Sequence, residues 1–90
     1  MADTPTEQLQ MEFPCDFAFK AFGPNGPEFA ERVRQAVAGT VDVSMDALKV
    51  RPSSQGKYQC VTVLVLLHSK QQLHAIYAAL RKVEGLVYLV

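Results

Sequence analysis

Cysteine, net charge and long apolar runs are all scarce in this sequence, and each scarcity excludes a class of protein. The only two cysteines, Cys15 and Cys60, lie far apart and match no spacing of a metal-binding or redox motif. We therefore expect two reduced thiols and no metal site. Nine basic residues balance nine acidic residues, so net charge does not steer the chain toward nucleic acid or anionic lipid.

No apolar run reaches the roughly 18 residues that a membrane-spanning helix needs. The start of the chain is polar and lacks the basic and apolar segments of a signal peptide, so we expect a soluble cytoplasmic protein that does not bind membranes. Residues 1–12 are aperiodic and are predicted to form a disordered leader. Residues 13–90 then form a single domain, for which the length suffices.

Residues 58–67 form the most apolar segment, and alternate positions on both of its faces are apolar. Such a strand is usually central in a sheet and covered on both sides. Alternation also predicts strands at 15–22, at 48–51 and at 86–90. The strand at 48–51 has basic residues on one face and is followed by Pro52, as is typical of an edge strand.

Two amphipathic helices separate these strands. The first begins at Pro27, which suits the first helical position, and ends near Gly39. The second follows Ser69, which has Gln72 three residues later in the spacing of a capping box, and it is predicted to end at Gly85.

The order strand, helix, strand, strand, helix, strand predicts an α+β fold of the ferredoxin-like βαββαβ type. In this sandwich a four-stranded antiparallel sheet carries both helices on one face. Right-handed crossovers place the first and third strands in the middle and the other two at the edges.

Several short segments resemble one family. They are Glu12-Phe13-Pro14, Gly23 with Pro27-Glu28, and above all residues 50–58, Val-Arg-Pro-Ser-Ser-Gln-Gly-Lys-Tyr. These segments resemble the YbeD-like group of small uncharacterised bacterial proteins, whereas Gly85 and Val87 depart from its pattern. That group is similar in fold to ACT domains, which sense small ligands and pair through their sheets. The resemblance implies an ACT-like fold without assigning an activity.

The loop before the first helix is a candidate site for a small anionic ligand, because a helix N-terminus offers unpaired N–H groups and positive charge. The residues expected to contribute are Gly23, Asn25, Gly26, Lys20 and Arg51. A purely structural role for this loop, as the start of a helix, stays open.

The hairpin motif comprises Arg51, Pro52, Ser53, Ser54, Gly56 and Tyr58. A plain turn explains it, because proline ends a strand, serine satisfies backbone groups and glycine adopts positive φ. An anion-binding role stays open as the alternative.

Helices on one face of the sheet leave apolar side chains on the other. The predicted interface consists of Phe22, Leu64, Leu66, Val87 and Leu89. Contiguous exposed apolar side chains mark interaction surfaces, so we expect a homodimer or a protein partner on this face.

The sequence offers no recognisable acid, base and nucleophile, and His68 and His74 lack the spacing of metal ligands. We therefore expect no cofactor and no catalysis, and predict a non-enzymatic, ACT-like regulatory or protein-interaction module that senses a small ligand. One alternative is a small enzyme or accessory factor acting on acyl or phosphate groups. The other is a nucleic-acid-binding module, which is disfavoured because Phe22 is the only outer-face aromatic expected to stack on bases.

Overall fold

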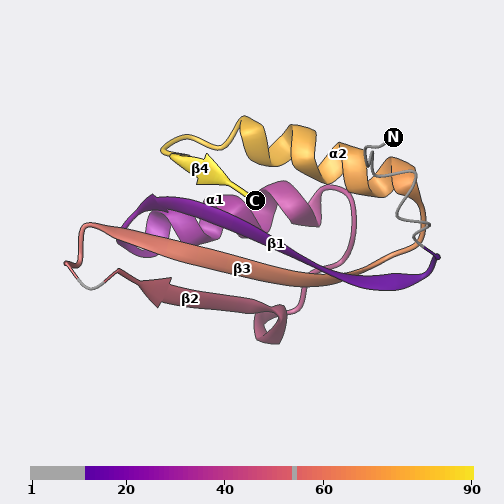
Figure 1. Ribbon diagram of the computed structural model, residues 1–90, viewed down its shortest axis with the longest axis horizontal. Coiled ribbons are helices and arrows are strands. Elements are labelled where there is room, and N and C mark those ends of the chain that lie inside the picture. Colours follow the sequence, from indigo (N-terminus) through magenta and orange to yellow (C-terminus); the bar gives the residue numbers. More distant parts are fainter. Residues whose placement is uncertain (1–11, 54) are drawn as a thin grey trace, which may run out of the picture.

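A computed structural model describes residues 12–53 and 55–90 and confirms the predicted ferredoxin-like plan (Figure 1). Its elements are β1 (Cys15–Pro24), α1 (Pro27–Ala38), a short 3-10 helix η2 (Met45–Ala47), β2 (Leu48–Pro52), β3 (Tyr58–Leu67), α2 (Lys70–Arg81) and β4 (Tyr88–Leu89). The strands of the sheet have the order β2-β3-β1-β4, and each neighbouring pair of strands is antiparallel. Apart from Glu12, the predicted leader lies outside the described residues.

The two central strands, β1 and β3, pair along their full length, from Cys15 opposite Leu67 to Pro24 opposite Tyr58. Because side chains alternate along a strand, this register divides the sheet into two faces. The helix face carries the buried side chains, and in Figure 1 α1 lies behind β1 and β3. The other face is called the outer face below.

The core lies between the sheet and the two helices. Its buried members are Phe19, Ala21, Phe29, Val33, Val37, Val61, Val63, Val65, Leu67, Leu73, Ile76 and Leu80. An aromatic group extends it, in which the Phe19 ring centroid lies 4.8 Å from that of Phe17 and 5.0 Å from that of Tyr77. Burying each large apolar side chain stabilises the fold by about 1.5–3 kcal/mol.

The second helix begins where predicted but ends earlier. Ser69 Oγ accepts a hydrogen bond of 3.2 Å from the Gln72 backbone N–H, and Gln72 Oε1 accepts one of 2.7 Å from the His68 N–H. The predicted end at Gly85 is wrong, because α2 ends at Arg81 and the chain continues in tight turns. The partly buried Val83 extends the apolar stripe past the last helical turn, which made the helix look longer.

The last strand also differs from the prediction. It comprises only Tyr88 and Leu89, and each side chain lies on the face of the sheet opposite to the one predicted for it. Leu89 lies opposite Ala21 and packs against the core, while Tyr88 lies opposite Phe22 on the outer face. The placement of Leu89 on the outer face was therefore wrong. All five residues of 86–90 are apolar or aromatic, so their alternation does not show which face of this strand is buried.

Candidate functional site

The loop between β1 and α1 is tied to the β2–β3 hairpin by buried and exposed hydrogen bonds. Gln59 is only 3% exposed, and its Nε2 donates to the Pro24 carbonyl at 2.8 Å and to the Gly26 carbonyl at 2.7 Å. Asn25 donates its backbone N–H to the Lys57 carbonyl and its Nδ2 to the Gly56 carbonyl, both at 3.0 Å. These contacts give the loop a structural role.

The residues predicted to bind an anion fall into two separate groups. Gly23, Asn25 and Gly26 lie at the loop, where the backbone of Gly23 is buried against the ring of Phe29. Lys20 and Arg51 instead lie on the outer face, opposite Thr62 and Cys60. Because α1 packs on the helix face, the structure does not bring these two basic residues to the start of α1.

The hairpin motif is explained by turn geometry in the part that the structure describes, which excludes Ser54. Ser53 donates its N–H to the Tyr58 carbonyl at 2.8 Å and accepts from the Gly56 N–H at 3.0 Å. Gly56 has a φ of 76°, a left-handed value that favours glycine. Pro52 ends β2, as the sequence predicts.

Half of the outer face is an exposed aliphatic surface, which we call the leucine end and define as Ala18, Leu64 and Leu66. Leu64 lies opposite Ala18 on the central strand pair, and Leu66 lies opposite Asp16. Leu64 is 52% exposed and Leu66 is 48% exposed. Both positions were expected at an interface, and neither side chain is used by the core.

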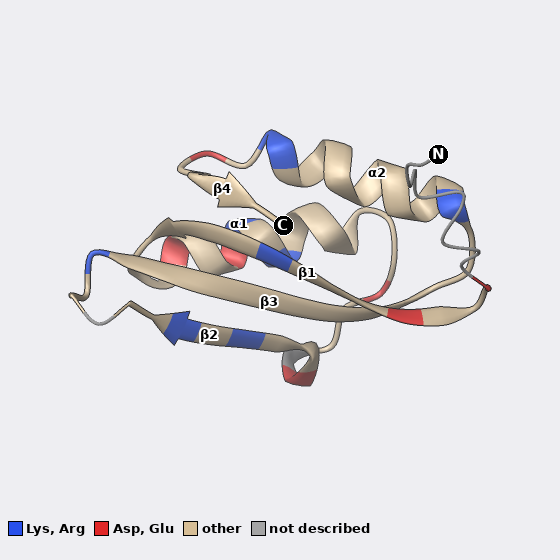
Figure 2. Cartoon of the chain, in the orientation of Figure 1, with Lys and Arg blue, Asp and Glu red and all other residues tan. Residues whose placement is uncertain are grey.

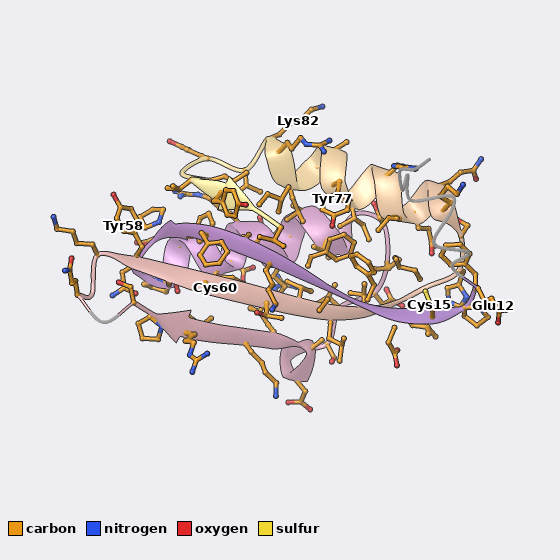
Figure 3. The ribbon with its side chains drawn as sticks, in the orientation of Figure 1. Glu12, Cys15, Tyr58, Cys60, Tyr77 and Lys82 are labelled. Carbon is orange, nitrogen blue, oxygen red and sulfur yellow. The ribbon has the colours of Figure 1, made fainter. Side chains whose placement is uncertain are left out.

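The other half is the aromatic end, which we define as Phe22, Tyr58 and Tyr88. The Phe22 and Tyr88 rings lie side by side, with centroids 5.8 Å apart and planes inclined by 50°. Tyr88 is 62% exposed and Tyr58 is 51% exposed. Figure 3 shows Tyr58 at the hairpin end of β3, close to Cys60. Sequence reasoning missed Tyr88, and only the register of β4 against β1 reveals its face.

A small pocket of about 180 Å³ opens at the aromatic end. It is lined by Phe22, Arg51, Pro52, Ser53, Tyr58, Gln59 and Cys60. A larger groove of about 450 Å³ lies at the opposite end of the sheet and is lined by Ala38, Thr40, Val41, Asp42, Leu66, His68 and Gln72. The small pocket borders the aromatic end, whereas the large groove borders the leucine end.

Basic side chains lie between the two ends. Lys20 and Lys49 flank Thr62 in the register, and Arg51 lies two residue pairs further toward the hairpin, as the blue segments of β1 and β2 show in Figure 2. Within residues 12–53 and 55–90, the one salt bridge joins Arg34 to Glu31 on α1. The basic residues of the sheet therefore have no carboxylate partner within those ranges.

The ion pair on α1 perturbs both of its members. Arg34 Nε donates to Glu31 Oε1 at 3.0 Å. This hydrogen bond lowers the pKa of the Glu31 carboxyl and raises the pKa of the Arg34 guanidinium. Burial raises the pKa of the Tyr77 hydroxyl, and the nearby charge of Arg81 opposes that shift.

Free thiols and clusters of metal-ligating side chains are the features of the described residues that bear on catalysis. Among those residues, no three His, Cys, Asp or Glu side chains lie close enough together to hold a metal ion. Cys60 Sγ lies 3.9 Å from Thr62 Oγ1, which is not a general base. Cys15 is a second free thiol, at the opposite end of β1 in Figure 3. None of the helices that the structure describes is long and apolar enough to cross a membrane.

Two solved structures have a fold similar to that of this chain, and one of them is an ACT domain. The solution structure of protein HP0495 from H. pylori matches with a TM-score of 0.70 and 10% identity, covering 100% of this chain and 98% of that one. The ACT domain from the GTP pyrophosphokinase of Chlorobium tepidum matches with a TM-score of 0.60 and 14% identity, covering 84% of this chain and 97% of that one. At such identities the likeness concerns the fold.

Residues 8–90 match the family described as "Protein of unknown function (DUF493)", and this chain belongs to that family. A UPF0250 protein of Paraburkholderia phytofirmans is 48% identical over 71 residues, which cover 77% of this chain and 79% of that protein. A UPF0250 protein of Shewanella sediminis is 36% identical over 85 residues, 94% of each chain. These bacterial relatives confirm the family to which the sequence resemblance pointed.

Proposed function

We propose that this protein is a non-enzymatic interaction module that self-associates through the leucine end of its outer sheet face. The observation that carries the proposal is the half exposure of Leu64 and Leu66 on a central strand, while both helices occupy the opposite face. Removing apolar surface from water contributes about 25 cal/mol per Å². Contact with a second copy would therefore stabilise these two side chains.

The charges beside the leucine end support a second copy as the occupant. Along the outer face of β1 the order is Asp16, Ala18, Lys20. Consider two copies packed with their outer faces together, related by a two-fold axis that runs perpendicular to the strands and passes by Ala18. Asp16 of one copy would then lie opposite Lys20 of the other. The same axis would place the two Leu64 side chains together, so the surface is self-complementary in both charge and apolarity.

Sedimentation at rising protein concentration tests this proposal. The wild type should shift toward a dimer, and a Leu64→Ser, Leu66→Ser variant should stay monomeric with unchanged helical content. Val87→Ser is the matched control, because Val87 is exposed but lies outside the leucine end. The proposal fails if the wild type stays monomeric throughout, or if the double variant associates as strongly as the wild type does.

The proposal includes the absence of a reaction, a location in the cytoplasm and a regulatory role that follows the ACT-like fold by analogy. Screens with acyl phosphates, thioesters and phosphate esters should show no turnover. The enzymatic alternative would gain support from turnover that persists through purification and is lost in Cys60→Ala. A small ligand that alters self-association would support the regulatory role.

A further inference from the structure

We propose that the aromatic end binds single-stranded nucleic acid, with bases stacked on its rings and phosphates held by the basic residues beside it. This inference goes beyond self-association and uses the rings of the same outer face, and Lys20 is the one residue that both proposals use. It depends on the register of β4, which places Tyr88 beside Phe22 instead of in the core.

The three rings come from three adjacent strands. Tyr88 lies on β4, Phe22 lies on β1, and Tyr58 lies at the start of β3, opposite Pro24. More than half of each tyrosine is exposed, although a monomer gains nothing from placing such rings in water. Bases stack on exposed aromatic rings without regard to sequence, because every base has a π-face.

The pocket beside these rings suits one planar ring. Phe22 and Tyr58 supply aromatic walls, Arg51, Pro52 and Ser53 lie at its edge, and the surface exposed inside it is almost entirely apolar, as the face of a base requires. Its volume of about 180 Å³ is smaller than the 300–1,000 Å³ typical of pockets for drug-sized ligands. Arg51 can stack on a base or bind a phosphate, because its guanidinium is planar and charged.

The charge distribution favours an anionic strand at this place despite the neutral chain. Arg51 lies on β2 and lines the pocket beside the rings, and Lys49 and Lys20 lie between the two ends of the face. Among the acidic residues that the structure describes, Glu28 and Glu31 lie on α1, Asp16 lies at the far end of β1, and Glu84 precedes β4 in the turn (Figure 2). Asp46 lies on η2 just before β2, at the end of that strand away from Arg51, and Glu12 and Asp42 lie outside the sheet. The outer face therefore presents positive charge locally. An acidic peptide would match the charge, but it would leave the three rings and the pocket without a use.

Fluorescence anisotropy with a labelled single strand of about ten nucleotides, a length within the usual site sizes, tests the proposal on the full chain. Binding should occur at low salt. With two phosphate contacts, log K should fall with log salt at a slope of about −1.4. Tyr88→Ala should weaken binding by about 5- to 150-fold, whereas Tyr88→Phe should keep it, because stacking needs only the ring. Arg51→Gln should reduce the salt slope by about 0.7.

Three controls separate this proposal from its rivals. Val87→Ala removes an exposed apolar side chain outside the aromatic end, and Lys70→Gln removes a charge on α2, so neither should change affinity as Tyr88→Ala does. The Leu64→Ser, Leu66→Ser variant should bind the strand as the wild type does. This result would distinguish a loss of self-association from a loss of nucleic-acid binding. The proposal is overturned by the absence of binding at low salt, by equal affinity for duplex, or by Tyr88→Ala binding like wild type. It is also overturned if a poly-glutamate peptide binds more tightly than the strand.

Discussion

At Gly23 the backbone of β1 packs directly against the Phe29 ring of α1. A Cβ atom at this position would overlap the ring carbons of Phe29, which is itself fully buried in the core. The ring has no free space to move into, because protein cores are close-packed. The glycine is therefore required by packing, which gives Gly23 a structural role that does not depend on a ligand.

Gly23→Ala should lower the free energy of unfolding by about 1–3 kcal/mol through overpacking. Urea denaturation measures the change. Gly39→Ala is the matched control, because Gly39 has a φ of −69° and the nearest atom to an added Cβ is 3.7 Å away. That control should be neutral or stabilising by up to about 1 kcal/mol. Equal effects of the two substitutions would contradict the packing account.

Gln59→Leu should also destabilise the fold, because it leaves the carbonyls of Pro24 and Gly26 without their side-chain donor. A buried polar group that loses its partner costs about 1–3 kcal/mol. Thermal and urea unfolding should both report the loss. Gln71→Leu, at an exposed position of α2, is the control and should change stability little. If both variants unfold alike, the link between loop and hairpin is not important for stability.

The Glu31–Arg34 pair makes the contribution of one carboxyl group, that of Glu31, to the stability of the fold depend on pH. The hydrogen bond from Arg34 lowers the pKa of Glu31 below its ordinary value of 4.5, so the folded state favours the carboxylate. The associated stability is present above the ordinary pKa and is lost as pH falls through the lowered value. NMR titration of the Glu31 carboxyl should show this low pKa in the wild type and a return toward 4.5 in Arg34→Ala. An unchanged midpoint would show that Arg34 is not the cause.

At the scale of elements, α2 depends on its first residues. Ser69 Oγ accepts the Gln72 N–H, one of the helix N–H groups that have no partner within the helix. Ser69→Ala should cost about 1 kcal/mol of stability in urea denaturation. Ser69→Asp should retain the cap, because its carboxylate accepts the same bond and complements the helix dipole. A loss as large in Ser69→Asp would point to a cause other than capping.

The sequence predicts elements well where a pattern has a single physical explanation. Pro27 and Gly39 bracket α1, and the apolar run of 58–67 indicates the central strand. The same reasoning fails at the last strand, where every side chain is apolar or aromatic and the pairing with β1 selects the buried face. It also fails at the loop between β1 and α1, which was predicted to bind an anion. Gln59 reaches Pro24 across 35 positions of the chain, a contact that no local pattern indicates.

At the scale of the whole molecule, the one-sided arrangement of helices determines what the sheet can do. The helix face is used by the core, and the outer face carries an aliphatic half and an aromatic half separated by basic residues. We propose a second copy as the partner of the leucine end and a planar, anionic partner for the aromatic end. The two halves can be tested independently because they share none of their defining residues.

A dilution series followed by amide NMR tests the central claim, that the outer face is an interaction surface, most directly. As the protein concentration rises, the amide signals of β1 and β3 around Ala18 and Leu64 should shift together and saturate. Signals from the exposed sides of α1 and α2 should not move, because those surfaces stay in water. Shifts confined to the helices, or no concentration-dependent shift at any residue, would contradict the account.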